Sequence, residues 1–216
     1  MRAIGIAIGS PVADGKGRIV CLTSVLPGEG TAALAANLAS HLASIGNSVL
    51  LVDADSRDAR LSRWLASGAD QGIVEALLQD KPLDECVLYD SKTNLSLLPM
   101  TTGGGRIVEP SALFASARAR AFFETLAAQY QHVILDLPPL SVAADARAAA
   151  HFADSFVLAA QWGKATPQLI SDLLDAEPEV RAKLLGLVLT HADLRKLPLY
   201  AAAGSRGWFQ RRIARG

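Results

Sequence analysis

One stretch near the N-terminus, Thr23 to Ala33, constrains the fold of this 216-residue chain more than any other. It reads Thr-Ser-Val-Leu-Pro-Gly-Glu-Gly-Thr-Ala-Ala and follows Arg18 to Leu22, an apolar run typical of a buried strand. The next residues, Ala33 to Leu42, have apolar side chains at helical spacing. A strand, a glycine-rich loop and a helix in this order place backbone N–H groups and a helix N-terminus where they can bind a phosphate.

The loop has the frame of a P-loop but lacks two of its side chains. A P-loop ends in Gly-Lys followed by Ser or Thr, whereas this loop ends in Gly30-Thr31-Ala32. The lysine that contacts phosphate and the hydroxyl that holds magnesium are therefore missing. The amides of Gly28 to Ala32 still favour an anion. Normal phosphoryl transfer is not expected, because it depends on positioning and charge neutralisation. Thr31 has a simpler interpretation as a helix cap.

Composition limits the classes of function. The 21 basic and 21 acidic residues cancel, so no global charge argument favours a nucleic-acid partner. Cys21 and Cys86 do not suggest a disulfide framework or a zinc site, and Cys21 is expected in the core. No apolar run reaches the roughly 18 residues of a membrane span, and no signal-peptide pattern is present. We expect a cytoplasmic protein, peripheral at the inner membrane if a partner or an amphipathic segment holds it there.

Apolar runs alternate with helical segments along the rest of the chain. The expected strands are Ser48–Asp55, Leu95–Pro99, His132–Pro139, Ser155–Ala160 and Leu184–Thr190. The expected helices are Ser111–Tyr130 with Ser111 as N-cap, Ala143–Ala150 and Pro167–Leu174, with shorter apolar-faced segments at Leu61–Leu65 and Gly72–Leu78. Gly103 to Gly105 predicts a flexible loop. We divide the chain into a loose leader (1–17) with one short extended piece, a P-loop NTPase-like domain (18–200) and a basic tail (201–216).

This alternation predicts an α/β fold with a doubly wound, mainly parallel sheet and helices on both faces. In such sheets ligands bind beyond the carboxyl ends of the strands. The glycine loop, Asp53, Asp55 and Asp136 each follow a strand, so we expect them to gather at one edge. Each aspartate has an alternative interpretation as a turn or cap residue. Asp53 and Asp55 also alternate along the chain and need not face the same way.

Three segments resemble the nucleotide motifs of the bacterial tyrosine kinases of capsule and exopolysaccharide synthesis, which are relatives of the ParA/MinD ATPases. These segments are Pro27–Gly30, Leu51–Arg57 and Ile134–Pro139, and the resemblance runs from about Arg18 to Tyr200, with Asp145 and Gly186–Thr190 included. The resemblance implies ATP and Mg²⁺ as cofactors and a membrane-anchored polysaccharide copolymerase or export protein as partner. It assigns nucleotide binding to Pro27, Gly28, Glu29, Gly30, Thr31 and Ala32, catalysis to Asp53, Asp55 and Asp136, and the metal to Asp53 and Asp136.

Three departures from the family pattern indicate a pseudokinase. Thr31 and Ala32 stand where the family has Lys and Ser or Thr, and the leader lacks the Glu-x-x-Arg-x-x-Arg helix used for ring formation. The C-terminal tyrosine cluster is reduced to Tyr200, which is a phosphosite candidate. We therefore expect weak or absent binding of ATP and Mg²⁺, and a catalytically impaired regulator of polysaccharide biosynthesis and export.

Two other functions stay open. One is an active, divergent tyrosine autokinase in which a residue such as Lys164 replaces the lost lysine. The other is a ParA/MinD-like positioning ATPase. The stretch from Leu194 to Gly216 holds six basic residues and no acid, with Trp208, Phe209 and Ile213 interleaved. This tail is either a contact to anionic lipid or a solvated, disordered end.

Overall fold

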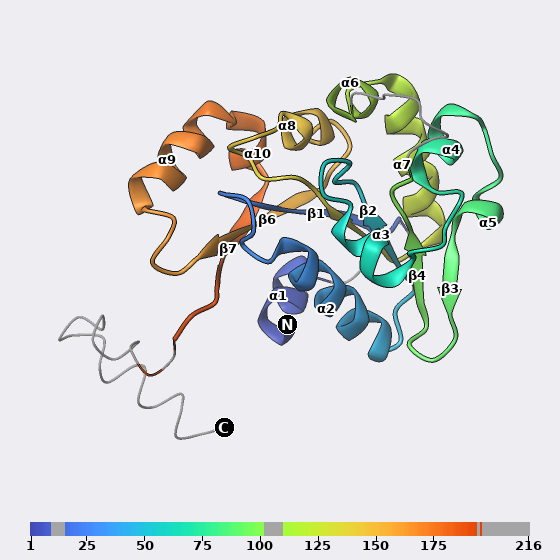
Figure 1. Cartoon of the computed structure of the whole chain (residues 1–216), viewed down its shortest axis with the longest axis horizontal. Helices are drawn as coiled ribbons and strands as arrows, with labels where there is room; N and C mark the ends of the chain where they lie inside the picture. The colour runs from blue at the N-terminus through green and yellow to red at the C-terminus, as the bar shows by residue number, and fades with distance from the viewer. Residues whose placement is uncertain (10–15, 102–109, 194, 196–216) are drawn as a thin grey trace.

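The centre of the structure is one mainly parallel β-sheet (Figure 1). The computed structural model describes residues 1–9, 16–101, 110–193 and 195. Within them, seven strands follow the order β3-β4-β2-β5-β1-β6-β7. The strands are β1 (Arg18–Ser24), β2 (Val49–Asp53), β3 (Leu88–Asp90), β4 (Leu95–Leu98), β5 (His132–Asp136), β6 (Ser155–Gln161) and β7 (Leu184–Thr190). Only the pairing of β3 with β4 is antiparallel.

Helices cover both faces of the sheet, because alternate residues of each strand point to opposite sides and both sides are apolar. One face is covered by α1 (Arg2–Ile8), α2 (Thr31–Ser44) and α3 (Arg60–Leu65). The other face is covered by α4 (Ile73–Leu78), α5 (Leu83–Cys86), α6 (Pro110–Phe114), α7 (Ala117–Gln129), α8 (Asp145–Ala149), α9 (Pro167–Ala176) and α10 (Pro178–Ala182). The predicted doubly wound architecture is confirmed.

The two cores differ in how they fill space. On the face of α7, Phe123 stacks on Phe152 with 4.1 Å between ring centroids, and Phe114 meets both rings edge-on. On the face of α2, the helix buries alanines between its leucines, and small side chains let a helix lie close to a sheet. The tight approach fixes the axis of α2 and therefore the position of its N-terminus above the sheet edge.

Three local predictions were wrong. The expected extended piece in the leader is the helix α1, whose Ile8 joins the core of the α2 face. The single helix expected from Ser111 to Tyr130 is two helices, and Ser111 lies inside α6 instead of capping it. The cap of the second helix is Ser116, whose hydroxyl accepts a hydrogen bond from the N–H of Ala119 at 3.1 Å. Strand β3 was not expected, because its three residues are all exposed.

Strand β7 forms one edge of the sheet. Its Leu185, Leu187 and Leu189 are among the exposed large apolar side chains of the described residues. Among those residues, no helix has the length and apolar character of a membrane span. The glycine triplet at 103–105, Tyr200 and the basic tail lie outside the described residues.

Candidate functional site

The glycine loop and the acidic segments meet at one edge of the sheet. Leu22 of β1 pairs with Asp136 of β5, and Asp136 pairs in turn with Asp53 of β2. All three strands are parallel, so the segments that follow them emerge together, as predicted. They enclose a cavity of about 400 Å³. Its lining is Ser24, Pro27, Gly28, Glu29, Gly30, Thr31, Ala32, Ala33, Asp55, Arg57, Asp58, Arg60, Trp64, Asp136, Leu137, Pro139 and Val142.

The backbone of the loop presents the amides that an anion requires. Gly28 and Gly30 have φ angles of 79° and 84°, a left-handed conformation that glycine adopts without strain. Gly30 is the N-cap of α2 and offers no side chain, so the first N–H groups of the helix have no side-chain acceptor. Thr31 is the first residue of the helix, and its interpretation as a cap is wrong. The N-terminus of a 14-residue helix therefore opens into the cavity.

Glu29 holds the loop from inside. Only 1% of its surface is exposed, and each carboxylate oxygen accepts one backbone hydrogen bond. Oε2 accepts from the N–H of Leu26 at 2.8 Å, and Oε1 accepts from the N–H of Gln161 at 3.0 Å. Gln161 is the last residue of β6, so the carboxylate connects the glycine loop to the neighbouring strand. Its side chain has a positioning role, and only its backbone is available to a nucleotide.

Further hydrogen bonds connect the loop to the segment after β5. The hydroxyl of Thr23 donates to the carbonyl of Pro138 at 2.7 Å. The N–H of Leu140 donates to the carbonyl of Ser24 at 2.8 Å. These two bonds join the end of β1, where the loop begins, to the segment after β5.

Asp53 is engaged in holding the segment after β2. Its Oδ2 accepts hydrogen bonds from the N–H and the hydroxyl of Ser62, at 2.8 and 2.7 Å, and its Oδ1 accepts from the N–H of Asp55 at 3.2 Å. The residue is fully buried, and burial raises the pKa of its carboxyl group. Asp53 is not part of the cavity lining. The partner Ser62 was not predicted, since a serine nine residues away carries no sequence signal of this contact.

Asp136 is the carboxylate that is both buried and turned toward the cavity. It is 3% exposed and lines the cavity, and its Oδ1 has no hydrogen-bond partner among the described residues. Burial, followed by the charges of Asp53 and Asp55, raises its pKa well above the usual range. A buried polar atom without a partner in the protein is rare, and this one is a candidate contact for a ligand, water or ion in the cavity.

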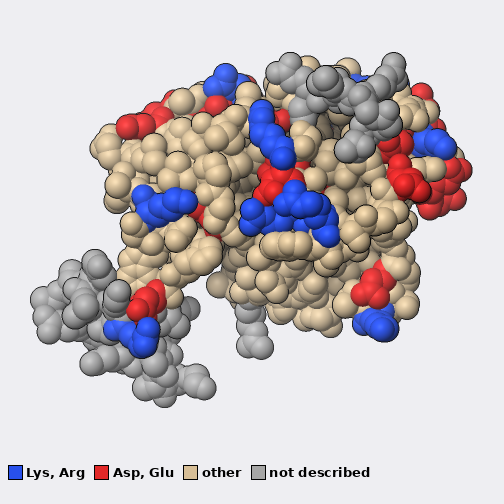
Figure 2. All heavy atoms as spheres, viewed as in Figure 1, with Lys and Arg blue, Asp and Glu red and all other residues tan. Residues whose placement is uncertain are grey.

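Basic side chains also line the wall of the cavity. Arg57 and Arg60 both line the cavity. The guanidinium of Arg60 pairs with Asp58 at 2.7 Å and lies 5.7 Å from the ring centroid of Trp64. That of Arg57 makes no hydrogen bond or ion pair with the described part of the chain. Figure 2 shows blue and red atoms gathered near the middle of the viewed face, around α3. The wall therefore has charges of both signs.

The donors for magnesium are incomplete. Asp136 has an unused oxygen, but Ala32 has none, and Asp53 already uses both of its oxygens for hydrogen bonds within the protein. No group of three or more His, Cys, Asp or Glu side chains with metal-binding geometry occurs in the described ranges. Magnesium in phosphate sites needs only one or two carboxylates besides phosphate and water, and here Asp136 keeps an oxygen for it while Ala32 supplies no hydroxyl.

Comparisons with known proteins agree with this geometry. A family model described as cellulose biosynthesis protein BcsQ matches residues 18–177. The succinoglycan biosynthesis transport protein ExoP of Rhizobium meliloti is 31% identical over 196 residues, which are 91% of this chain and 25% of ExoP. The tyrosine-protein kinase YwqD of Bacillus subtilis is 30% identical over 199 residues, which are 92% of this chain and 83% of YwqD.

A solved structure shows the same architecture. The kinase domain of VpsO superposes with a TM-score of 0.74 at 26% identity, covering 84% of this chain and 88% of that domain. The chain thus spans a quarter of ExoP but most of YwqD and of the VpsO domain.

Proposed function

Because this chain belongs to the P-loop family that includes cellulose biosynthesis protein BcsQ and the tyrosine-protein kinase YwqD, we propose that it regulates polysaccharide biosynthesis and export without phosphoryl transfer. In this proposal it binds nucleotide weakly, with little dependence on magnesium. It acts in the cytoplasm, at the inner membrane, on a membrane-anchored copolymerase or export protein. Its partner is a protein and not a nucleic acid.

The observation that carries the proposal is the mismatch between the loop and its first helical turn. The backbone amides and the N-terminus of α2 open into the cavity, while Thr31 and Ala32 stand where charge and a metal oxygen are needed. A charge-assisted hydrogen bond contributes about 1.5–3 kcal/mol, so losing the lysine weakens ground-state binding. It also removes stabilisation of the charge that develops in the transition state. The missing lysine therefore lowers the rate of phosphoryl transfer more than it lowers the affinity for nucleotide.

The family relationship supports the setting. ExoP is named as a biosynthesis transport protein for succinoglycan, and several relatives are named as tyrosine-protein kinases. These names are our basis for proposing an export protein as the partner of this chain.

The kinase part is tested on the pure protein with magnesium-ATP. We expect no phosphotyrosine signal above that of Asp136→Asn, which changes the carboxylate that faces the cavity. YwqD is the positive control. ATP-dependent labelling of tyrosine that Asp136→Asn abolishes would establish the active-kinase alternative instead.

The regulatory part is tested by polymer output in a strain that lacks the gene. Wild-type protein and Asp136→Asn should restore output equally, because the proposed function needs no phosphoryl transfer. If the folded variant, produced at the wild-type level, fails to restore output, then the proposed function is wrong. Deletion of residues 207–216 in the same strain tests the tail, and an unchanged output and membrane association would make it a plain disordered end.

A further inference from the structure

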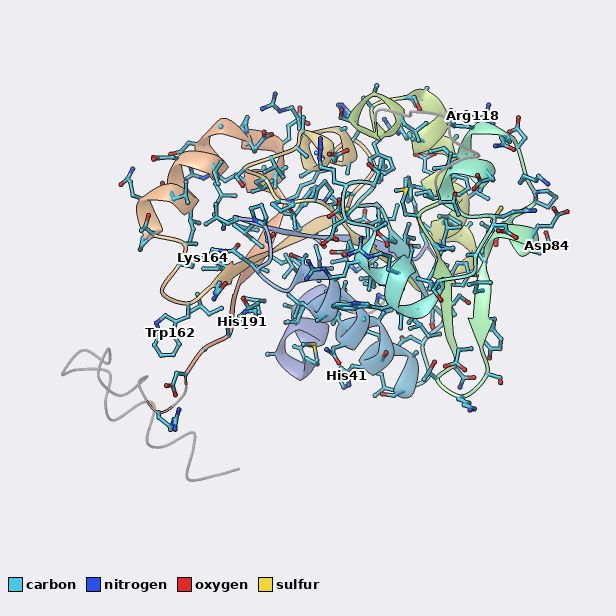
Figure 3. The ribbon with its side chains drawn as sticks, in the orientation of Figure 1. His41, Asp84, Arg118, Trp162, Lys164 and His191 are labelled. Carbon is cyan, nitrogen blue, oxygen red and sulfur yellow. The ribbon has the colours of Figure 1, made fainter. Side chains whose placement is uncertain are left out.

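The turn after β6 holds a lysine against the glycine loop. The turn contains Gly163, with a φ of 76°, and closes through the N–H of Lys164, which donates to the carbonyl of Gln161 at 3.1 Å. The ammonium Nζ of Lys164 donates to the carbonyl of Pro27, the first residue of the loop, at 3.2 Å. Figure 3 shows Lys164 on the segment between β6 and α9. A positive charge therefore lies beside a glycine loop that has Thr31 where a P-loop has its lysine.

The charge of Lys164 is not neutralised by the described residues. The side chain is exposed, and no carboxylate of the described ranges lies within ion-pair distance of it. An ammonium group has three donors, and the carbonyl of Pro27 uses one of them. The other two are available to a ligand.

The lysine also lies close to a peptide unit of the glycine loop. The carbonyl of Pro27 belongs to the same peptide unit as the N–H of Gly28, so standard bond lengths place Nζ within about 6 Å of that nitrogen. The carbonyl and the N–H of a trans peptide unit point in opposite directions, so Nζ must leave the carbonyl of Pro27 and swing around the loop to contact a phosphate on the Gly28 amide.

Two independent contacts keep the turn and the loop together. One is the bond of Lys164 to Pro27, and the other is the buried carboxylate of Glu29, which accepts from the N–H of Gln161 three residues before the lysine. The distance from the lysine backbone to the loop is therefore fixed by the fold. Pro27 lines the cavity that also contains the unpartnered oxygen of Asp136, whereas Lys164 does not line it, so the ammonium lies beside the cavity.

We propose that Lys164 is a phosphate-binding residue, which supplies from the β6–α9 turn the positive charge that Thr31 does not supply from the loop. The ligand class is a nucleoside polyphosphate, held by the amides of the glycine loop and by this ammonium group. The inference rests on the nucleotide binding in the proposed function. It explains how the loop binds an anion with little help from magnesium, since a lysine needs no metal to contact phosphate.

The experiment is calorimetric titration of the full chain with ATP and, separately, with inorganic tripolyphosphate, in the presence of a chelator. Lys164→Met should weaken binding of both probes about tenfold, equal to about 1.4 kcal/mol, and Lys164→Arg should keep most of the affinity. Lys92→Met is the matched control. It removes the same charge from an exposed lysine just before β4, at the opposite edge of the sheet, and should change nothing.

Three outcomes would overturn the inference, and they differ in what else they affect. If Lys164→Met binds ATP within twofold of wild type, Lys164 has no such role and the proposed function stands. If only Arg57→Met weakens binding, the compensating charge comes from Arg57 and not from Lys164. If wild-type protein binds neither probe, the nucleotide-binding part of the proposed function fails together with the inference.

Discussion

The buried carboxylate of Glu29 gives a prediction that the structure makes quantitative. Glu29→Gln keeps the volume of the side chain and removes its charge. The carboxylate accepts one N–H at each oxygen, from Leu26 and from Gln161. A glutamine amide has one acceptor, so its NH₂ group must face one of these two donors.

The expected loss of stability follows from the two bonds. A hydrogen bond to a charged group contributes about 1.5–3 kcal/mol, and a buried donor left without a partner costs about 1–3 kcal/mol. Glutamine retains one neutral bond and is easier to bury than a charge, which offsets part of this loss. We expect the free energy of unfolding to fall by about 2–4 kcal/mol. For a chain of this length the melting temperature falls by about 5–15 °C.

Urea denaturation followed by circular dichroism measures the change. Glu124→Gln on α7 is the control, because Glu124 is exposed and its pair with Arg120 is a surface pair worth about 0.5 kcal/mol at most. Hydrogen exchange supplies a local readout, since the amides of Leu26 and Gln161 should exchange faster in Glu29→Gln. A stability within about 0.5 kcal/mol of wild type would refute the assigned role of Glu29 as a connection between the loop and β6.

Three further predictions concern the cavity and the core. The double variant Thr31→Lys with Ala32→Ser should tighten ATP binding at least about tenfold in calorimetry and make it depend on magnesium, and equal affinity would mean that the cavity is blocked elsewhere. Phe123→Ala should lower the free energy of unfolding by about 3–5 kcal/mol in urea, because it leaves a cavity beside Phe152, and a loss below about 1 kcal/mol would contradict this packing. Burial raises the pKa of Asp136, so the folded protein keeps a proton that the unfolded chain releases, and this group's contribution to stability falls as the pH rises above its ordinary pKa. Asp136→Asn should therefore stabilise the protein at pH 7 and change its stability little near pH 3, and urea denaturation at both pH values measures the difference.

Sequence reasoning recovered what local patterns encode. The β-branched run before the glycine loop is β1, and the apolar run before Asp53 is β2, because strands buried on both faces are continuously apolar. The helical spacing of Ala33 to Leu42 is part of α2, which runs from Thr31 to Ser44. Ser116 was missed because alanines on both sides of it continue the helical pattern. Strand β3 was missed because none of its side chains is buried, so it has no apolar pattern.

The site was predicted in position but not in detail. The carboxyl-end rule brought Asp53, Asp55 and Asp136 to the edge that holds the glycine loop. The same rule says nothing of which acid faces a ligand. Asp53 turns to Ser62 and Glu29 turns to Gln161, and the second contact joins residues 132 positions apart. The roles of these acids, magnesium binding and the phosphosite at Tyr200 stay predictions.

The central place of β1 has a consequence for how the chain acquires its structure. Its neighbours in the sheet are β5 and β6, and each pairing joins residues more than a hundred positions apart. Most of the chain must therefore be synthesised before the strand that carries the glycine loop has any partner. Until then an apolar segment is unpaired, and such long-range parallel pairing is slow and prone to aggregation. The strand that carries the glycine loop therefore gains its sheet partners late in synthesis although it is near the start of the sequence.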